Sequence, residues 1–135
     1  MTFRSSRNLV AALALLGGLT SFGTAVHAEH WGALAAGIEE ESDGSSHVSV
    51  GSALNHESRA AAQRAALASC RSTGNSACRV ISTFNGCGYI TLSTDGSRPA
   101  AWGSGPTAQD AYDECYKRIR SGNCKRPIGG CNEED

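Results

Sequence analysis

Bulky apolar side chains are scarce in this sequence. Among 135 residues there are two tryptophans, three tyrosines, three phenylalanines and one methionine, against sixteen glycines. A small chain buries only a modest fraction of its surface on folding, so a deep core would need large side chains. Their shortage excludes such a core and predicts a thin one that needs covalent support.

Several motifs of catalytic and metal sites are also missing. None of the six cysteines has the Cys-x-x-Cys spacing of redox pairs and zinc ligands. Neither Gly51-Ser52 nor Gly103-Ser-Gly105 completes the G-x-S-x-G turn of a serine hydrolase. We therefore expect no catalytic cysteine, no metal and no cofactor, and we favour a protein that is not an enzyme.

The one long apolar run lies at the N-terminus. Two arginines precede it, it extends from Leu9 to Leu19, and Val26 and Ala28 stand at the −3 and −1 positions of a cleavage site. This pattern predicts a secretory signal peptide over residues 1–28. A membrane anchor is the alternative, but the run falls short of the roughly 20 apolar residues that a spanning helix needs.

Cleavage after Ala28 would leave residues 29–135 as a single secreted or periplasmic domain without a transmembrane segment. Arg4 and Arg7 would leave with the signal peptide, so Lys plus Arg falls from 12 to 10 against 13 Asp plus Glu. The resulting charge of −3 provides no basic surface for nucleic acid. An exported chain with six cysteines predicts structural disulfides, each typically worth about 2–4 kcal/mol.

Strands are predicted where apolar residues alternate with polar ones or β-branched residues cluster. Asn85-Gly86 suits a type I′ turn, which needs positive φ angles, and predicts a hairpin between the strands on either side. The segment through Trp102 is expected to add the next strand of this meander. The predicted strands cover 31–37, 47–54, 78–84, 87–92, the residues around 100–102, and 124–128, with a solvated acidic loop over 39–46.

Two helices are predicted, each with a stripe of small residues that ends near a cysteine. The first follows capping residues at 55–58 and ends at Gly74, and the second takes Thr107 as its N-cap. We therefore predict an α+β fold, in which an antiparallel sheet is packed by two helices, with an internal pseudo-repeat and disulfide bracing. The stripes are Ala62, Ala66, Leu67 and Cys70, and Ala108, Ala111, Tyr112, Cys115 and Ile119.

The pseudo-repeat bears on the cysteine pairing. Superposing Cys70 on Cys115 places Ala66 on Ala111. Six cysteines permit 15 pairings, and the sequence alone does not choose among them. The main alternative to symmetric pairing exchanges partners between the halves. Symmetry favours Cys70 with Cys78, Cys115 with Cys124, and Cys87 with Cys131 as a bridge that joins the halves.

Cations cluster around the end of the second helix, where they could meet an anionic glycan, a lipid head group or an acidic protein. The favoured alternative is that they compensate the helix dipole and are neutralised by the acidic tail at 133–135. These candidate binding residues are Lys117, Arg118, Arg120, Lys125 and Arg126.

Two further residue sets could carry function. The histidines could gather with two carboxylates into an acid–base or metal site, although nothing in their spacing requires it and surface positions explain them as well. Trp31 and Trp102 could be exposed recognition anchors, but in a chain short of large apolar groups we favour a place in the core. The possible acid–base set is His30, His47, His56, Glu57 and Asp43.

The order of several short motifs resembles one known family. Trp31-Gly-Ala-Leu-Ala is followed by Ala-Leu-x-x-Cys at 66–70, Cys78-Arg-Val, Phe-x-x-Cys at 84–87, Trp102-Gly and Thr-x-x-x-Ala-x-x-x-Cys at 107–115. Over residues 31–131 the chain is similar to the bacterial secreted family called domain of unknown function 4189. The resemblance implies a small exported α+β domain with paired cysteines, and the family has no agreed activity or catalytic residues that could be carried over to this chain.

These observations favour an exported, disulfide-stabilised interaction protein, in its sharper form a secreted effector or inhibitor. Its partner would be an unknown protein or an anionic ligand of the cell envelope. The alternatives are a small envelope hydrolase acting on peptidoglycan or glycan, and a structural component of the envelope.

Overall fold

The computed structural model describes residues 29–134, and the predicted signal peptide over residues 1–28 lies outside this part. Two strands, a helix and a third strand follow one another twice along the chain. The fold is therefore α+β, as predicted. The elements are β1 (Trp31–Glu40), β2 (Ser46–His56), α1 (Arg59–Arg71), β3 (Arg79–Phe84), β4 (Cys87–Leu92), β5 (Trp102–Gly105), α2 (Ala108–Arg118) and β6 (Ile128–Cys131).

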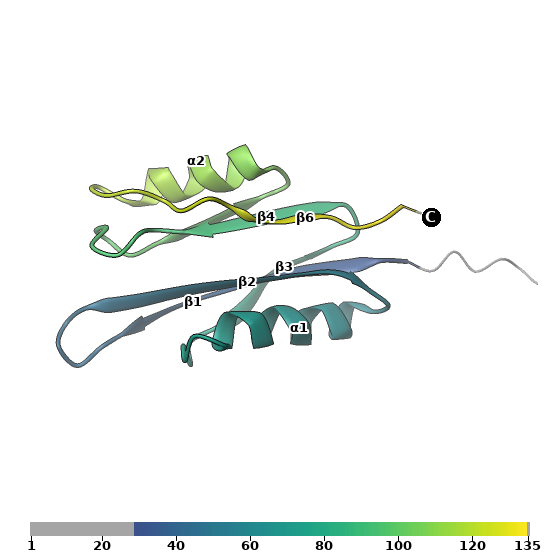
Figure 1. The fold of residues 1–135 in the computed structure, drawn as a ribbon, viewed down its shortest axis with the longest axis horizontal. Helices are drawn as coiled ribbons and strands as arrows, with labels where there is room; N and C mark the ends of the chain where they lie inside the picture. Colours follow the sequence, from purple (N-terminus) through teal and green to yellow (C-terminus); the bar gives the residue numbers. More distant parts are fainter. Residues whose placement is uncertain (1–28, 135) are drawn as a thin grey trace, which may run out of the picture.

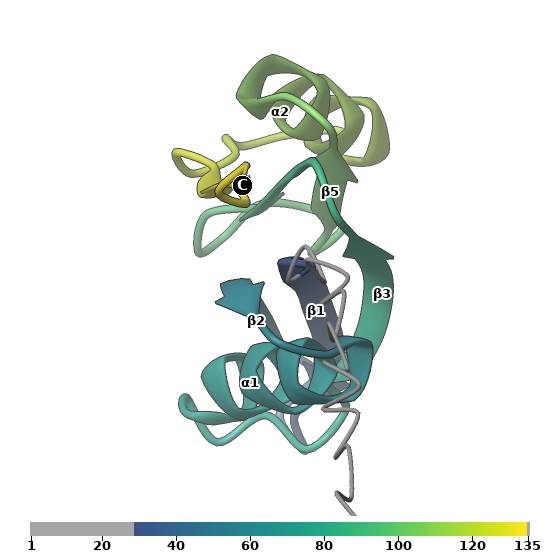
Figure 2. The same cartoon turned by 90° about the vertical axis from the view of Figure 1, so that its right-hand side faces the viewer.

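Two antiparallel sheets stack between the two helices, where the sequence suggested one sheet. The first sheet has the strand order β2-β1-β3 and the second β5-β4-β6. Helix α1 covers the outer face of the first sheet and α2 that of the second (Figures 1 and 2). The layers therefore run helix, sheet, sheet, helix, with the two sheets facing each other in the middle.

The two halves of the fold share more than their element order. In each half the first strand is central, the second lies on one side of it, and the strand after the helix lies on the other. We call residues 31–84 the first unit and residues 87–131 the second unit. The internal repeat itself stays a prediction from the sequence.

Strand β1 is buried on both faces, which explains its unbroken apolar run. Ala33 and Ala35 face α1, whereas Leu34 and Ala36 pack with Ile90 between the sheets. Successive side chains of a strand point to opposite faces, so a central strand with layers above and below has no polar face. Leu34 and Ile90 are the largest fully buried apolar side chains, each worth about 1.5–3 kcal/mol on burial.

Small residues let the helices lie close to their sheets. The buried face of α1 is formed by Ala62, Ala66 and Cys70. Because these side chains are small, α1 can lie close to β1 and β2. Both helices begin at the predicted caps, since the hydroxyl oxygens of Ser58 and Thr107 accept backbone N–H bonds of 3.1 Å three residues on. Such caps are typically worth about 1 kcal/mol each.

The predicted hairpin at Asn85-Gly86 is wrong. Strand β3 pairs with β1 in the first sheet, and β4 pairs with β5 and β6 in the second. A type I′ turn needs positive φ at both central residues, and neither Asn85 nor Gly86 has it. This segment instead crosses from one sheet to the other.

Asn132 forms the hydrogen bonds that fix the segment crossing between the two sheets. Its side-chain amide donates to the carbonyls of Phe84, Asn85 and Gly86 at 3.1, 2.9 and 3.2 Å. Its carbonyl oxygen accepts from the backbone N–H of Asn55 at 2.8 Å. Because Asn132 is only 6% exposed, removing its side chain would take this donor from the carbonyls of Phe84 and Asn85, whereas the carbonyl of Gly86 would keep the backbone N–H of Asn132 at 2.9 Å.

Three disulfides brace the fold, and they pair the cysteines in the manner that symmetry favoured. Cys70 bonds Cys78 and Cys115 bonds Cys124, with Cα–Cα distances of 6.1 and 6.3 Å. Cys87 bonds Cys131. This last bridge was expected to join the halves, but it links the paired strands β4 and β6 inside the second unit, because β4 does not pair with β3.

The end of the chain departs from the sequence prediction in its strand boundaries. The last strand was expected at 124–128, but β6 spans Ile128–Cys131. Cys124 forms only an isolated bridge with Ser93. Within residues 29–134, no helix has the length and apolar character needed to cross a membrane.

Candidate anion-binding groove

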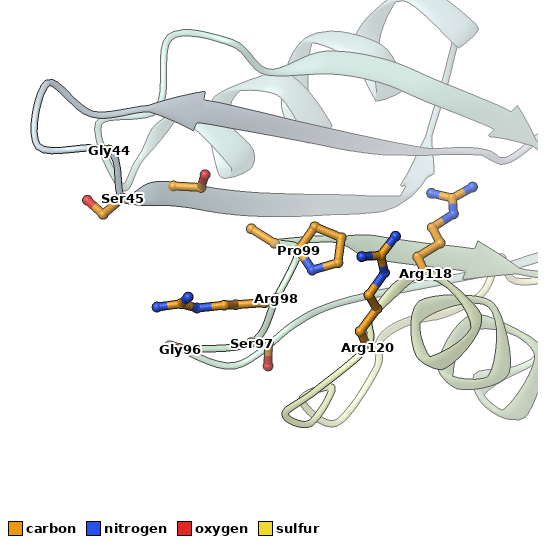
Figure 3. Close-up of a pocket in the computed structure, with 10 residues that line it drawn as sticks. Gly44, Ser45, Gly96, Ser97, Arg98, Pro99, Arg118 and Arg120 are labelled. Atoms are coloured by element: carbon orange, nitrogen blue, oxygen red, sulfur yellow. The ribbon is translucent and has the colours of Figure 1, made fainter.

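An open hollow of about 740 Å³ lies where the β1–β2 turn of the first unit faces the second unit (Figure 3). Three arginines from the second unit line it, which makes its wall cationic. The remaining wall is made of small residues and hydroxyls. We call this hollow the arginine groove, and its lining residues are Gly44, Ser45, Ser46, Gly96, Ser97, Arg98, Pro99, Ala100, Arg118 and Arg120.

Backbone hydrogen bonds bring Arg98 and Arg120 together, although 21 residues separate them in the sequence. The N–H of Arg98 donates to the carbonyl of Ser121 at 3.0 Å, and the N–H of Arg120 donates to the carbonyl of Arg98 at 2.7 Å. Both side chains are exposed. Within residues 29–134, neither guanidinium makes an ion pair, so both charges are available to a ligand.

The loop that carries Arg98 is anchored by a buried serine. The Ser97 hydroxyl donates to the carbonyl of Asn123 at 3.0 Å and accepts from its N–H at 3.1 Å. It also lies 3.0 Å from the hydroxyl of Thr94. Since Ser97 is 7% exposed, the loop position is fixed while the neighbouring arginine side chain remains in solvent.

Arg118 is oriented by its surroundings. Its guanidinium lies 4.5 Å from the ring centroid of Trp102, donates to the Trp102 carbonyl at 2.9 Å, and pairs with Glu114 one turn earlier at 2.5 Å. Glu114 offsets part of its charge. Arg118 therefore forms a fixed wall of the groove, and Arg98 and Arg120 supply the uncompensated charge.

The opposite wall is the tight β1–β2 turn. Asp43 accepts from the hydroxyl and the N–H of Ser45 at 2.5 and 2.9 Å, and these bonds hold the pKa of the Asp43 carboxyl below its usual 3.8. Gly44 completes the turn with φ of +84°, a conformation that glycine adopts without strain. The carboxylate is thus used within the turn, which presents Ser45 and Ser46 to the groove.

A second, smaller hollow of about 330 Å³ adjoins the groove. Ile38, which is 40% exposed, and Trp102 give it an apolar wall, and Arg79 of β3 adds one cation. Trp102 also carries Arg118 on its ring, so the two hollows meet at this stacked pair. We call it the apolar hollow, and its other lining residues are Ala36, Gly37 and Ala77.

The structure divides the five cations singled out in the sequence. Arg118 and Arg120 line the groove, whereas Lys117, Lys125 and Arg126 are exposed outside its lining. Glu133 and Glu134 do not neutralise the groove, because they follow β6 at the end of the molecule opposite the β1–β2 turn, where the N–H of Glu133 donates to the side chain of Asn55 (Figure 1). Sequence reasoning missed Arg98, which no local pattern connects to the other cations.

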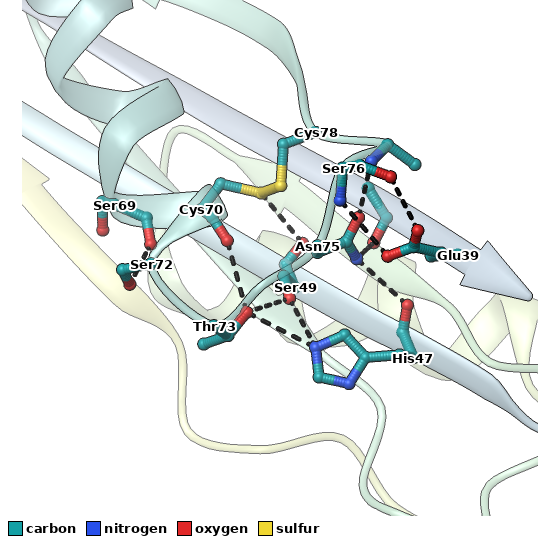
Figure 4. The surroundings of a disulfide bond; sticks show 12 residues. Glu39, His47, Ser49, Ser69, Cys70, Ser72, Thr73, Asn75, Ser76 and Cys78 are labelled. Atoms are coloured by element: carbon teal, nitrogen blue, oxygen red, sulfur yellow. Dashed lines mark hydrogen bonds between the residues drawn. A yellow bond between two sulfur atoms is a disulfide. The ribbon is translucent and has the colours of Figure 1, made fainter. Parts of the chain in front are cut away.

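The histidines and carboxylates proposed as an acid–base set are not gathered at one place, because they divide between the two ends of the β1–β2 pair. His47 and His56 stand near the two ends of β2, about 30 Å apart at ~3.3 Å per residue. The ring nitrogen Nε2 of His47 lies 3.0 Å from the Ser49 hydroxyl and 3.4 Å from that of Thr73 (Figure 4). Ser49 is 3% exposed, and its hydroxyl also lies 2.6 Å from that of Thr73, so this contact ties β2 to the segment that follows α1.

Glu39 has its own partner beside this contact. Its carboxylate accepts from the hydroxyl and the N–H of Ser76 at 2.6 and 3.2 Å (Figure 4). These bonds hold the pKa of the Glu39 carboxyl below its usual 4.5, with a smaller contribution from His47. Among the described residues no group of three histidines, cysteines or carboxylates could hold a metal ion.

The two tryptophans are half-buried, so they are neither fully exposed recognition anchors nor fully buried core residues. Each carries an arginine on its ring, Arg59 at 4.7 Å from the Trp31 centroid and Arg118 at 4.5 Å from that of Trp102. Both pack at the edge of a core cluster. They are not equivalent positions of the two units, because Trp31 begins a central strand and Trp102 begins an edge strand.

Comparison with known proteins adds one finding. A family model described as a domain of unknown function (DUF4189) matches residues 31–131. No curated protein and no solved structure matches the chain.

Proposed function

Because this chain belongs to the DUF4189 family, whose description names no activity, we propose its function from the groove: it is a non-enzymatic binding protein that recognises an anionic ligand with Arg98, Arg118 and Arg120. The observation that carries the proposal is the pair of exposed guanidinium groups of Arg98 and Arg120 in a hollow of about 740 Å³. Guanidinium groups form bidentate, charge-assisted hydrogen bonds with carboxylates and phosphates.

A binding role also suits the way the fold is braced. Three disulfides and two close-packed helices hold the strands whose connecting turn and loops line the groove. A stiff site loses less conformational entropy when a ligand binds, which favours affinity. The effector or inhibitor role is the sharper form of this proposal, and the groove would be its contact surface.

We further propose that the protein acts in the periplasm or outside the cell. Disulfides form and persist in oxidising compartments, and this chain has three. The intact mass of the protein purified from the periplasm of a bacterial host tests the proposal. We expect an N-terminus at Glu29 and the loss of six hydrogens, whereas a mass that retains residues 1–28 would contradict the signal peptide.

The binding proposal is tested by nuclear magnetic resonance with tripolyphosphate, a small linear polyanion. We expect saturable shifts of the backbone amides of Ser45, Ser46 and Ser97 in the protein exported and purified as above. The double variant Arg98→Gln/Arg120→Gln should lose these shifts. Lys125→Gln/Arg126→Gln removes the same charge outside the groove and should keep them. Equal, non-saturating shifts in both variants would refute a specific site.

A further inference from the structure

The arginine groove and the apolar hollow are linked by a stacked pair of lining residues, one from each hollow. Trp102 lines the apolar hollow, and Arg118 lines the groove. The guanidinium of Arg118 lies 4.5 Å from the ring centroid of Trp102. A ligand that passes over this stacked pair would therefore contact both hollows. Building on the proposed function, we infer that the ligand is an extended acidic protein segment that places one aliphatic side chain in the apolar hollow.

The placement of the cations favours a ligand with several separate charges. Figure 3 shows the three guanidinium groups apart from one another along the groove, without a common point at which they converge. A single small anion could satisfy only one or two of them. A segment with successive carboxylates can pair with Arg98 and Arg120 in turn, because a bidentate guanidinium–carboxylate bond is formed locally, while Arg118 already pairs with Glu114.

The lining also distinguishes an acidic protein segment from a sugar chain. Of residues 29–134, no Asp, Glu, Asn or Gln side chain lines the groove, and such groups commonly serve the hydroxyls of sugars as acceptors and donors. The ring face of Trp102 that could stack on a sugar is covered by Arg118. Carboxylates need neither feature, so the groove fits them better.

The apolar hollow lies beside two sheet edges, which suits an extended backbone. Strand β3 pairs only with β1, and β5 only with β4, so each leaves one edge unpaired within residues 29–134. Arg79 of β3 and Trp102 of β5 both line the hollow, and Figure 2 shows the two strands on the same side of the molecule. An extended segment can add main-chain hydrogen bonds to an unpaired strand edge.

The aliphatic side chain of the ligand would contact an exposed apolar residue of the apolar hollow. Ile38 is one of two large hydrophobic residues that the described part of the chain leaves exposed, at 40%. Together with Ala36 and Trp102 it gives one wall of a hollow of about 330 Å³. Covering this wall removes apolar surface from water, which acidic residues alone would not do.

The test uses fluorescence anisotropy with a labelled peptide of sequence Glu-Glu-Glu-Leu-Glu-Glu-Glu and the purified protein. Two matched peptides replace all Glu by Gln, or the Leu by Ser. We expect saturable binding of the Leu peptide, roughly tenfold weaker binding of the Ser peptide, and none of the Gln peptide. Equal affinities of the Leu and Ser peptides would overturn the role of the apolar hollow.

Protein variants locate the contact. Arg98→Gln/Arg120→Gln should weaken binding roughly tenfold or more, while the charge-matched Lys125→Gln/Arg126→Gln should change it less than about twofold. Ile38→Ser should abolish the preference for Leu over Ser and leave the affinity of the Ser peptide unchanged. All three are exposed-residue variants, and circular dichroism checks that each is folded. Equal losses in the two double variants would mean non-specific attraction and would overturn the inference.

The outcomes separate this inference from the proposed function. Saturable tripolyphosphate binding without peptide binding overturns the acidic segment and leaves an anion site. A heparin fragment that binds more tightly than the peptide, with the same dependence on Arg98 and Arg120, identifies a polyanionic sugar chain instead. Failure of all three probes refutes both proposals.

Discussion

Gly51 of β2 and Gly103 of β5 hold the same position relative to the helices that cover them. A Cβ built on either glycine would collide with two backbone positions of its helix, four residues apart. The positions match in the two units. They are Ala66 and Cys70 for Gly51, and Ala111 and Cys115 for Gly103.

Alanine at either glycine should therefore destabilise the fold. The clash is with helix backbone and cannot be relieved by a side-chain rotation, so we expect Gly51→Ala and Gly103→Ala each to cost about 2–3 kcal/mol. Urea denaturation measures this. Gly86→Ala is the control, because a Cβ there meets nothing within 4 Å. Equal midpoints for Gly103→Ala and Gly86→Ala would show that α2 does not lie against β5.

The disulfides should differ in their response to reduction. Cys131 is exposed, whereas Cys70 and Cys115 are fully buried, so limited dithiothreitol should open Cys87–Cys131 first. Alkylation followed by peptide mapping identifies the reduced pair, and a map of the unreduced protein tests all three pairings. Peptides joined between the two units, such as Cys70 with Cys124, would contradict the structure.

The disulfide that is reduced first should contribute most to the free energy of unfolding, so removing Cys87–Cys131 by mutation should cost more than removing Cys70–Cys78. Cys87–Cys131 has a sequence separation of 44 and Cys70–Cys78 one of 8. Chain entropy then predicts losses of about 4 and 2.5 kcal/mol for the paired alanine variants. Urea denaturation compares the two. An equal or reversed order would show that native-state contacts, and not the closed loop, decide the contribution of each bridge.

Asn132→Ala should weaken the contact between the units. It removes the donor to three carbonyls and the acceptor for the N–H of Asn55, and we expect a loss of about 2–4 kcal/mol. Asn132→Asp keeps the acceptor but places a carboxylate, at a position only 6% exposed, against carbonyl oxygens, so it should lose at least as much stability as Asn132→Ala. If thermal unfolding of both variants matches the wild type, these hydrogen bonds do not hold the crossing segment.

The stability of the fold should fall in acid partly through Glu39. Ser76 lowers the folded-state pKa of this carboxyl below its usual 4.5, so its contribution is present above about pH 4.5 and is lost as the pH falls through the lowered value. Ser76→Ala should therefore be less stable than the wild type at pH 6 and nearly equal to it at pH 3. Urea midpoints at both pH values measure the difference. A pH-independent difference would assign the effect to packing.

Local signals predicted much of this fold. The helix caps at Ser58 and Thr107 and the small-residue faces of both helices depend on residues close in sequence. Such features are readable because the residues that decide them are neighbours. The symmetric cysteine spacing likewise indicated the bridges Cys70–Cys78 and Cys115–Cys124, each of which spans a helix end and the segment that follows it.

Long-range contacts explain what the sequence did not show. Asn85-Gly86 favours a tight turn, but Asn132, 46 residues further on, bonds the carbonyls there and the chain crosses between sheets. The arginine groove likewise depends on residues that are far apart in the sequence. Its lining comes from the β1–β2 turn, the loop with Arg98 and the residues after α2, and no pattern within any one of these segments announces the other two.

No covalent bridge spans the two units, since each disulfide closes within one of them. Only the peptide backbone between Phe84 and Cys87 joins them, helped by apolar packing and by the asparagine contacts. A force that pulls the two units apart would therefore separate the two sheets at their interface, while the disulfides within each unit stayed intact. A ligand that contacts Arg118 of the second unit and Ile38 of the first would hold the two sheets together across that plane.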